Sequence, residues 1–132
     1  MKIRAFVLAY AAAFGSDASL GGAHAGALDY RFEPAAAEVA NGDGTILAIR
    51  LVRIPTAKPV LGAIIFRTRL DMSPDAMAEM IARHEALGEA EPGVYRFKAN
   101  LNMAGGWALK LMAKVQGEAE TVTGVVKFMA RD

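Results

Sequence analysis

Alternation of apolar and polar residues is the feature that most constrains how this chain folds. From Trp107 to Gln116 apolar residues occupy every second position, and two lysines lie between them. A period of two residues is typical of a β-strand that buries one face. The segment from Val94 to Leu101 has the same pattern. In the longer segment, the residues expected to face a core are Trp107, Leu109, Leu111, Ala113 and Val115.

Turn signals separate several such segments along the chain. The expected strands are residues 28–34, 45–54, 60–70, 94–101, 107–116 and 121–129. Short strands joined by turns are typical of a two-sheet sandwich. The segment Glu91–Phe97 has the form acid-x-Gly-x-Tyr-x-apolar, which is similar to the tyrosine corner of immunoglobulin-like domains. We therefore expect an all-β, immunoglobulin-like sandwich of about seven strands with one short helix, in which the Tyr95 hydroxyl bonds nearby backbone.

The first 25 residues have the features of a secretory signal peptide. Two basic residues precede an apolar run from Ala5 to Phe14, and the segment Ala23–Ala25 has the small-residue pattern of a cleavage site. Cleavage after Ala25 would leave one exported domain, residues 26–132, in the periplasm. The alternative is an uncleaved anchor, but Asp17 interrupts the apolar run before the roughly 20 residues that span a bilayer.

Charge, cysteine and motif content exclude several classes of protein. Without residues 1–25, Lys plus Arg falls from 15 to 13 and Asp plus Glu from 14 to 13, so the net charge is 0. Nucleic-acid-binding proteins need an excess of basic charge. The chain has no cysteine, and the expected domain has a single histidine, so disulfides and a three-histidine zinc site are excluded. With no nucleophile or phosphate-binding motif either, we expect no enzyme.

Methionines gather in a short segment that interrupts the β pattern. Met72, Met77 and Met80 lie close together in the sequence, and His84 follows them. A serine–proline pair begins the segment from Pro74 to Leu87, and a glycine follows it. Because these are typical signals for the start and the end of a helix, we expect a helix there. On such a helix Met77, Met80 and His84 would share one face.

A thioether cluster in a cysteine-free exported domain points to copper. Thioethers are soft ligands that select Cu(I) over most divalent ions. Met103 precedes Trp107 in a Met-Ala-Gly-Gly-Trp turn, and it joins the cluster if that turn lies across the same end of the sandwich. The candidate ligands are Met72, Met77, Met80 and Met103, with His84 as an optional fifth. Trp107 is a candidate to cap the cation through its ring face.

The same residues also fit a structural role. An apolar stripe that includes Met77, Met80 and His84 would pack an ordinary helix onto a sheet. Methionine is a common filler of irregular core space, and Trp107 begins its strand on the inward side. The residue pattern alone favours packing over metal binding. Met112 falls on the outward phase of its strand and Met129 is near the C-terminus, so neither is included among the ligands.

Two motifs in the C-terminal part resemble a known family. They are Glu91-Pro92-Gly93-Val94-Tyr95-Arg96-Phe97 and Leu101-Asn102-Met103-Ala104-Gly105-Gly106-Trp107-Ala108-Leu109. These resemble the FixH/YtkA-like family, whose members share a Pro-Gly-x-Tyr strand and a Met-Ala-Gly-x-Trp turn. The similarity extends from about Thr68 to Phe128, and the segment Asp71–Met80 resembles the loop before that strand in exported, copper-associated members. The resemblance implies an immunoglobulin-like β-sandwich, a periplasmic location and a role in copper homeostasis or oxidase assembly.

Together these features predict a soluble periplasmic protein that sequesters or delivers Cu(I) through its methionines. The leader, which has the pattern of a cleaved one, departs from the membrane-anchored FixH proteins and makes a direct role in oxidase assembly less favoured. The alternative is an exported, non-catalytic interaction domain that docks an efflux or oxidase-assembly component, since methionine surfaces adapt to partners. Sulfurs that converge would favour copper binding, and sulfurs scattered through the core would favour docking.

Overall fold

β-Strands make up nearly all the regular structure of residues 29–132, the part of the chain that the computed structural model describes. The strands are β1 (Tyr30–Pro34), β2 (Glu38–Ala40), β3 (Gly42–Arg53), β4 (Lys58–Pro59), β5 (Ile64–Met72), β6 (Met77–Ile81), β7 (His84–Glu91), β8 (Val94–Leu101), β9 (Gly105–Lys114) and β10 (Val122–Arg131). In this range the helical structure is a single three-residue 3-10 turn, η2 (Ser73–Asp75). The leader predicted over residues 1–25 lies outside the described residues. Within residues 29–132 no helix is long and apolar enough to cross a membrane.

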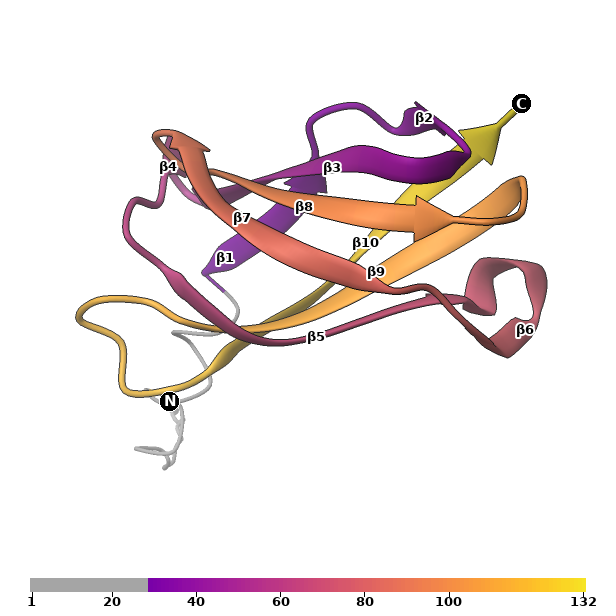
Figure 1. Cartoon of the computed structure of the whole chain (residues 1–132). Coiled ribbons are helices and arrows are strands. Elements are labelled where there is room, and N and C mark those ends of the chain that lie inside the picture. Colours follow the sequence, from indigo (N-terminus) through magenta and orange to yellow (C-terminus); the bar gives the residue numbers. More distant parts are fainter. Residues whose placement is uncertain (1–28) are drawn as a thin grey trace, which may run out of the picture.

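The strands form two sheets that lie one above the other (Figure 1). The first sheet has the order β1-β3-β8-β7, with β4 paired to β3, and the second has the order β2-β10-β9-β5-β6. Neighbouring strands are antiparallel except β2 and β10, which run parallel. The predicted all-β sandwich is confirmed. Residues 29–132 form ten strands where about seven were expected, and β2 and β4 are too short to show an alternating pattern.

One apolar core fills the space between the sheets. In β8, Tyr95, Phe97 and Ala99 are buried while the residues between them are exposed. In β9 and just after it, all five residues predicted to face inward are buried. Burying a large apolar side chain stabilises a fold by about 1.5–3 kcal/mol, so alternation over these two central strands is enough to fix which face of each points inward.

Tyr95 joins the first sheet to the connection between β4 and β5. Its hydroxyl donates to the Val60 carbonyl at 2.7 Å and accepts from the Ala63 N–H at 2.9 Å. The hydroxyl bonds backbone as predicted, but its partners are not the nearby residues that were expected. Burial raises the pKa of the phenol, while the Ala63 N–H opposes that shift. The backbone partner lies far back in the sequence rather than in the preceding turn, so the bond fixes a long connection.

The helix predicted from Pro74 to Leu87 is wrong. These residues form η2, β6 and β7. Ala76 adopts a left-handed conformation with φ 60° directly after η2 and ends the helical turn. β7 then pairs along β8, from His84 opposite Ala99 to Glu91 opposite Val94. Pairing with a central strand outweighs the high helix propensity of a segment rich in Ala, Glu and Met, because tertiary context overrides intrinsic propensity.

Candidate metal site

The η2 turn reverses the chain between β5 and β6, at one end of the sandwich (Figure 1). The Asp71 Oδ1 accepts a hydrogen bond from the Ser73 N–H at 3.0 Å, which is the geometry of an Asx turn. Pro74 supplies the fixed φ of a first helical residue, and the Ala76 N–H closes the turn on the Ser73 carbonyl at 2.9 Å. The reversal makes Met72 and Met77 cross-strand partners.

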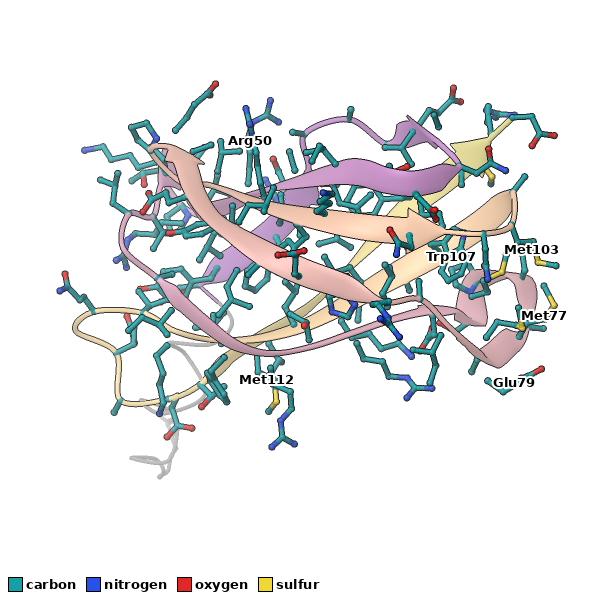
Figure 2. The ribbon with its side chains drawn as sticks, viewed as in Figure 1. Arg50, Met77, Glu79, Met103, Trp107 and Met112 are labelled. Carbon is teal, nitrogen blue, oxygen red and sulfur yellow. The ribbon has the colours of Figure 1, made fainter. Side chains whose placement is uncertain are left out.

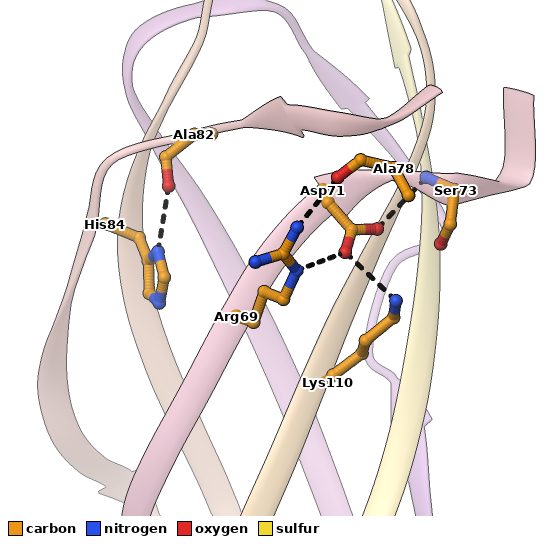
Figure 3. A network of polar contacts seen from close by, with 7 residues as sticks. All are labelled: Arg69, Asp71, Ser73, Ala78, Ala82, His84 and Lys110. Carbon is orange, nitrogen blue, oxygen red and sulfur yellow. Dashed lines mark hydrogen bonds and ion pairs between the residues drawn. The ribbon is translucent and has the colours of Figure 1, made fainter. Parts of the chain in front are cut away.

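Asp71 anchors this turn as a buried carboxylate (Figure 3). Its Oδ2 accepts hydrogen bonds from Arg69 Nε at 2.8 Å and from Lys110 Nζ at 3.0 Å. Burial on its own raises the pKa of Asp71. The hydrogen bonds from Ser73, Arg69 and Lys110 outweigh that effect and hold the pKa well below its usual range. Asp71 is therefore charged at neutral pH, and the adjacent side chains of Arg69 and Lys110 balance its charge.

β6 pairs with β5 irregularly, with an insertion of three residues on β6. Asp71 pairs with Ile81 and Met72 pairs with Met77, so residues 78–80 have no partners on β5. Arg69 Nη2 donates to the Ala78 carbonyl at 2.8 Å and satisfies a backbone acceptor inside the insertion. Met77 and Met80 are three residues apart and would lie on opposite faces of a regular strand. With the insertion, both pack against the core.

The Met103 turn, which joins β8 to β9, is docked onto η2. The Gly106 N–H donates to Asp75 Oδ2 at 3.1 Å, and Trp107 Nε1 donates to the Met103 carbonyl at 3.0 Å. Gly105 has φ 133°, and a Cβ there would lie 2.8 Å from the Met72 methyl carbon and would overlap the Asp75 carboxylate. Any other residue would be strained at this φ and would have to displace the ends of both side chains. The two methionine-bearing turns are therefore neighbours, although they are distant in the sequence.

The candidate sulfur ligands differ in burial. Met72 is fully buried, Met77 and Met80 are half-buried against the core, and Met103 is 40% exposed. Figure 2 shows Met77, Met103 and Trp107 at the same end of the molecule. The contacts of η2 thus place the segments that carry Met72 on β5, Met77 on β6 and Met103 on the β8–β9 turn at one end of the sandwich. Met80 lies further along β6.

His84 has partners away from the methionines. Its Nε2 lies 2.7 Å from Thr68 Oγ1, and its Nδ1 lies 3.1 Å from the Ala82 carbonyl oxygen. Thr68 precedes Met72 by four residues, about 13 Å along a strand. The shared helical face that grouped His84 with Met77 and Met80 does not exist. The structure therefore gives no geometric reason to place the imidazole in a sulfur site.

Trp107 is a core side chain, as its inward position predicts. The indole is fully buried, and its N–H is used by the Met103 carbonyl. This bond ties the Met103 turn to the core. A role as cation cap stays a prediction.

Other ligand types are not grouped in the described part of the chain. Residues 29–132 contain no group of three or more His, Cys, Asp or Glu side chains that could hold a metal ion.

Sequence reasoning missed Asp71 and Asp75, which set the geometry of this end. Aspartate side chains often bond the backbone two residues further on, so the Asx turn of Asp71 could have been predicted from the sequence. Asp75 meets Gly106 across 31 residues of sequence. No local pattern indicates that contact.

Comparison with known proteins assigns a family. A family model described as YtkA-like matches residues 24–112. The match covers more than half of the chain, so the protein belongs to the YtkA-like family. The matched range begins well before Thr68 and ends at Met112, and it contains both methionine-bearing turns. Comparison with curated proteins gave no match.

Proposed function

We propose that this protein binds Cu(I) through a thioether site made by Met72, Met77 and Met103, with Met80 beside it, and that it sequesters or delivers the ion. The observation that carries the proposal is the docking of the Met103 turn onto η2 through Asp75 and Gly106. That contact holds the turn that carries Met103 against the turn between Met72 and Met77, which are a cross-strand pair. A pair alone would be ordinary packing, whereas three thioethers from three segments match the soft, low-coordinate preference of Cu(I).

The surroundings of these sulfurs suit a transferable ion. Met72 is held by the core, and Met103 is exposed on a turn. With Met72 as a rigid, buried ligand and Met103 as an accessible one, the ion can enter and leave without unfolding the site. Thioethers carry no proton, so metal binding does not compete with protonation, as it does for imidazole and carboxylate ligands.

The protein is further proposed to be a soluble periplasmic domain of the immunoglobulin-like type without catalytic activity. The signal-like pattern of residues 1–25 supports export, and the family match begins at residue 24, next to the predicted cleavage site. The two face-to-face sheets of mostly antiparallel strands support the immunoglobulin-like type.

Competition with a chromophoric Cu(I) chelator, under anaerobic and reducing conditions, tests the copper proposal. The double variant Met77→Leu/Met103→Leu keeps apolar volume but removes two thioethers, and we expect its Cu(I) affinity to fall at least about tenfold, the equivalent of about 1.4 kcal/mol. The matched control, Met112→Leu/Met129→Leu, changes two methionines outside the site and should bind as wild type. Equal affinity in both double variants would refute the site, and no competition by the wild-type protein would refute copper binding.

The same titration at pH 5 and pH 8 tests whether an imidazole takes part. We expect equal Cu(I) affinity at both values. A site that includes an imidazole would bind Cu(I) more weakly at the lower pH, because a protonated imidazole is not a metal ligand.

A partner-docking role for the same end of the sandwich is the second candidate. Ile81 is 56% exposed at the end of β6, and Met103 is exposed nearby. Adaptable apolar side chains at the end of a sheet suit contact with another protein. Partner docking is favoured over copper binding if the wild-type protein does not compete with the chelator for Cu(I).

A further inference from the structure

The outer face of the second sheet carries a groove that the proposed copper site does not use. Its volume is about 330 Å³, within the range of small-molecule sites, about 300–1,000 Å³. The outward side chains that line it are Arg67, Arg69, Lys110, Met112, Thr123 and Val125. Figure 2 shows Met112 on the opposite side of the molecule from Arg50.

Strand register sets the lining side chains in two rows. Arg69, Lys110 and Val125 are cross-strand neighbours in one row, and Arg67, Met112 and Thr123 form the next. Side chains on one face of adjacent strands lie within contact distance of each other. The groove therefore has cations along β5 and at Lys110 of β9, and its apolar floor consists of Met112 on β9 and Val125 on β10.

The apolar floor is unusual for this position. The solvent-facing side of an antiparallel sheet normally carries polar residues. Here Met112 occupies the centre of its row, and Val125 is 53% exposed beside it. Neither side chain belongs to the apolar core between the sheets. Core packing therefore does not explain why these two positions are apolar.

The charge of the groove is positive. Asp71 binds Arg69 and Lys110 together, so one carboxylate balances two cations. Among residues 29–132 Arg67 forms no ion pair. Lys127 lies on the same face, opposite Ala108 in the neighbouring row. An anion with an apolar group matches both the charge and the floor.

We propose that this groove binds a small amphipathic anion, a medium-chain carboxylate. Its carboxylate pairs with Arg67 and Arg69 at the β5 side, and its chain lies over Met112 and Val125. The free guanidinium of Arg67 supplies a planar, bidentate partner for a carboxylate. The concave shape and limited volume favour a single ligand over a flat anionic surface.

Titration of the ¹⁵N-labelled protein with octanoate, followed by amide chemical shifts, tests this proposal. We expect saturable, single-site shifts confined to residues 67–69, 110–112 and 123–125. Acetate lacks the chain and should bind at least about tenfold more weakly, since burial of two methylene groups alone corresponds to that factor. Octyl glucoside keeps the chain but lacks the charge, and it should bind clearly more weakly because it cannot pair with Arg67 and Arg69. Shifts that do not saturate, or equal binding of octyl glucoside, would overturn the proposal.

Two exposed variants locate the ligand. Arg67→Ser should weaken octanoate binding about threefold to fivefold, the size expected for one exposed ion pair, and Val125→Ser should weaken it as well. Arg50→Ser, on the outer face of the other sheet, is the matched control and should bind as wild type. The variant Met77→Leu/Met103→Leu should also keep octanoate binding, because the groove is separate from the copper site. Unchanged affinity in Arg67→Ser would overturn the proposal.

Discussion

Asp71 shows at the scale of single residues how one side chain fixes the shape of a site that it does not enter. It is fully buried, yet it accepts hydrogen bonds from the Ser73 amide, from Arg69 and from Lys110. A buried carboxylate is stable only when its charge is matched and its oxygens are bonded. The same carboxylate sets the Asx turn that pairs Met72 with Met77.

Replacing Asp71 by Asn should lower the free energy of unfolding by about 2–3 kcal/mol at pH 7. The amide keeps the shape of the side chain but leaves Arg69 and Lys110 without their shared charge. Urea denaturation measures the change, and Asp43→Asn, at an exposed position, is the control with little expected effect. An unchanged midpoint for Asp71→Asn would contradict the anchoring role.

The stability supplied by Asp71 also depends on pH, with a definite sign. The folded pKa lies below the value of about 3.9 for an unfolded chain, so the unfolded state takes up the proton first as the pH falls. The contribution is complete above about pH 5 and is lost progressively from about pH 4 downward. The stability difference between wild type and Asp71→Asn should therefore shrink between pH 5 and pH 2. A difference that stays constant over this range would contradict the assignment.

At the scale of elements, η2 and the Met103 turn behave as one unit. Gly105 is the point of closest approach, because a Cβ there would meet both Met72 and Asp75. Its φ of 133° also lies in a region that other residues rarely adopt. The position of Met103 relative to Met77 is therefore set by a glycine that is not itself a ligand.

Gly105→Ala should destabilise the protein and move the Met103 turn away from η2. Gly117→Ala is the matched control, since Gly117 also has positive φ but has open space around a Cβ. We expect the control to cost about 1 kcal/mol and Gly105→Ala clearly more. Urea denaturation and Cu(I) competition measure the two effects, and only Gly105→Ala should weaken Cu(I) binding. Similar behaviour of the two variants would show that the close approach is unimportant.

Which elements the sequence reveals depends on their burial. β8 and β9 bury one face, so their alternation could be read directly. β7 is an edge strand with almost every residue exposed, and β6 pairs irregularly, so neither has a period of two. Local signals then favoured a helix over Pro74–Leu87. Pairing with β8 and β5, which those signals do not report, decided the outcome.

At the scale of the whole molecule, the sandwich followed from the sequence but the arrangement of the site did not. One-sided burial predicts that sheets pack face to face. The candidate methionines were predicted as residue types, whereas their grouping depends on the contact of Asp75 with Gly106 between distant segments. His84 was grouped with the methionines through a helix, and the observed strands direct its ring to Thr68.

The two proposed sites lie on different parts of the sandwich. The methionines occupy the end where η2 meets the Met103 turn, and the cationic groove lies on the outer face of the second sheet. Lys110 connects them, because it pairs with Asp71 beneath η2 and also lines the groove. Met77→Leu/Met103→Leu should weaken Cu(I) binding alone, and Arg67→Ser should weaken octanoate binding alone.

Methionine-methyl NMR with Ag(I), a redox-stable analogue of Cu(I), tests the central claim most directly. With ¹³C-methyl-labelled methionine, we expect one equivalent of Ag(I) to shift the methyl signals of Met72, Met77 and Met103 together. The methyl signal of Met80, which lies beside the proposed site, should shift with them. The signals of Met112 and Met129 should stay in place and serve as internal controls. Uniform shifts of every exposed methionine, or no shift of Met77 and Met103, would contradict a thioether site at this end of the sandwich.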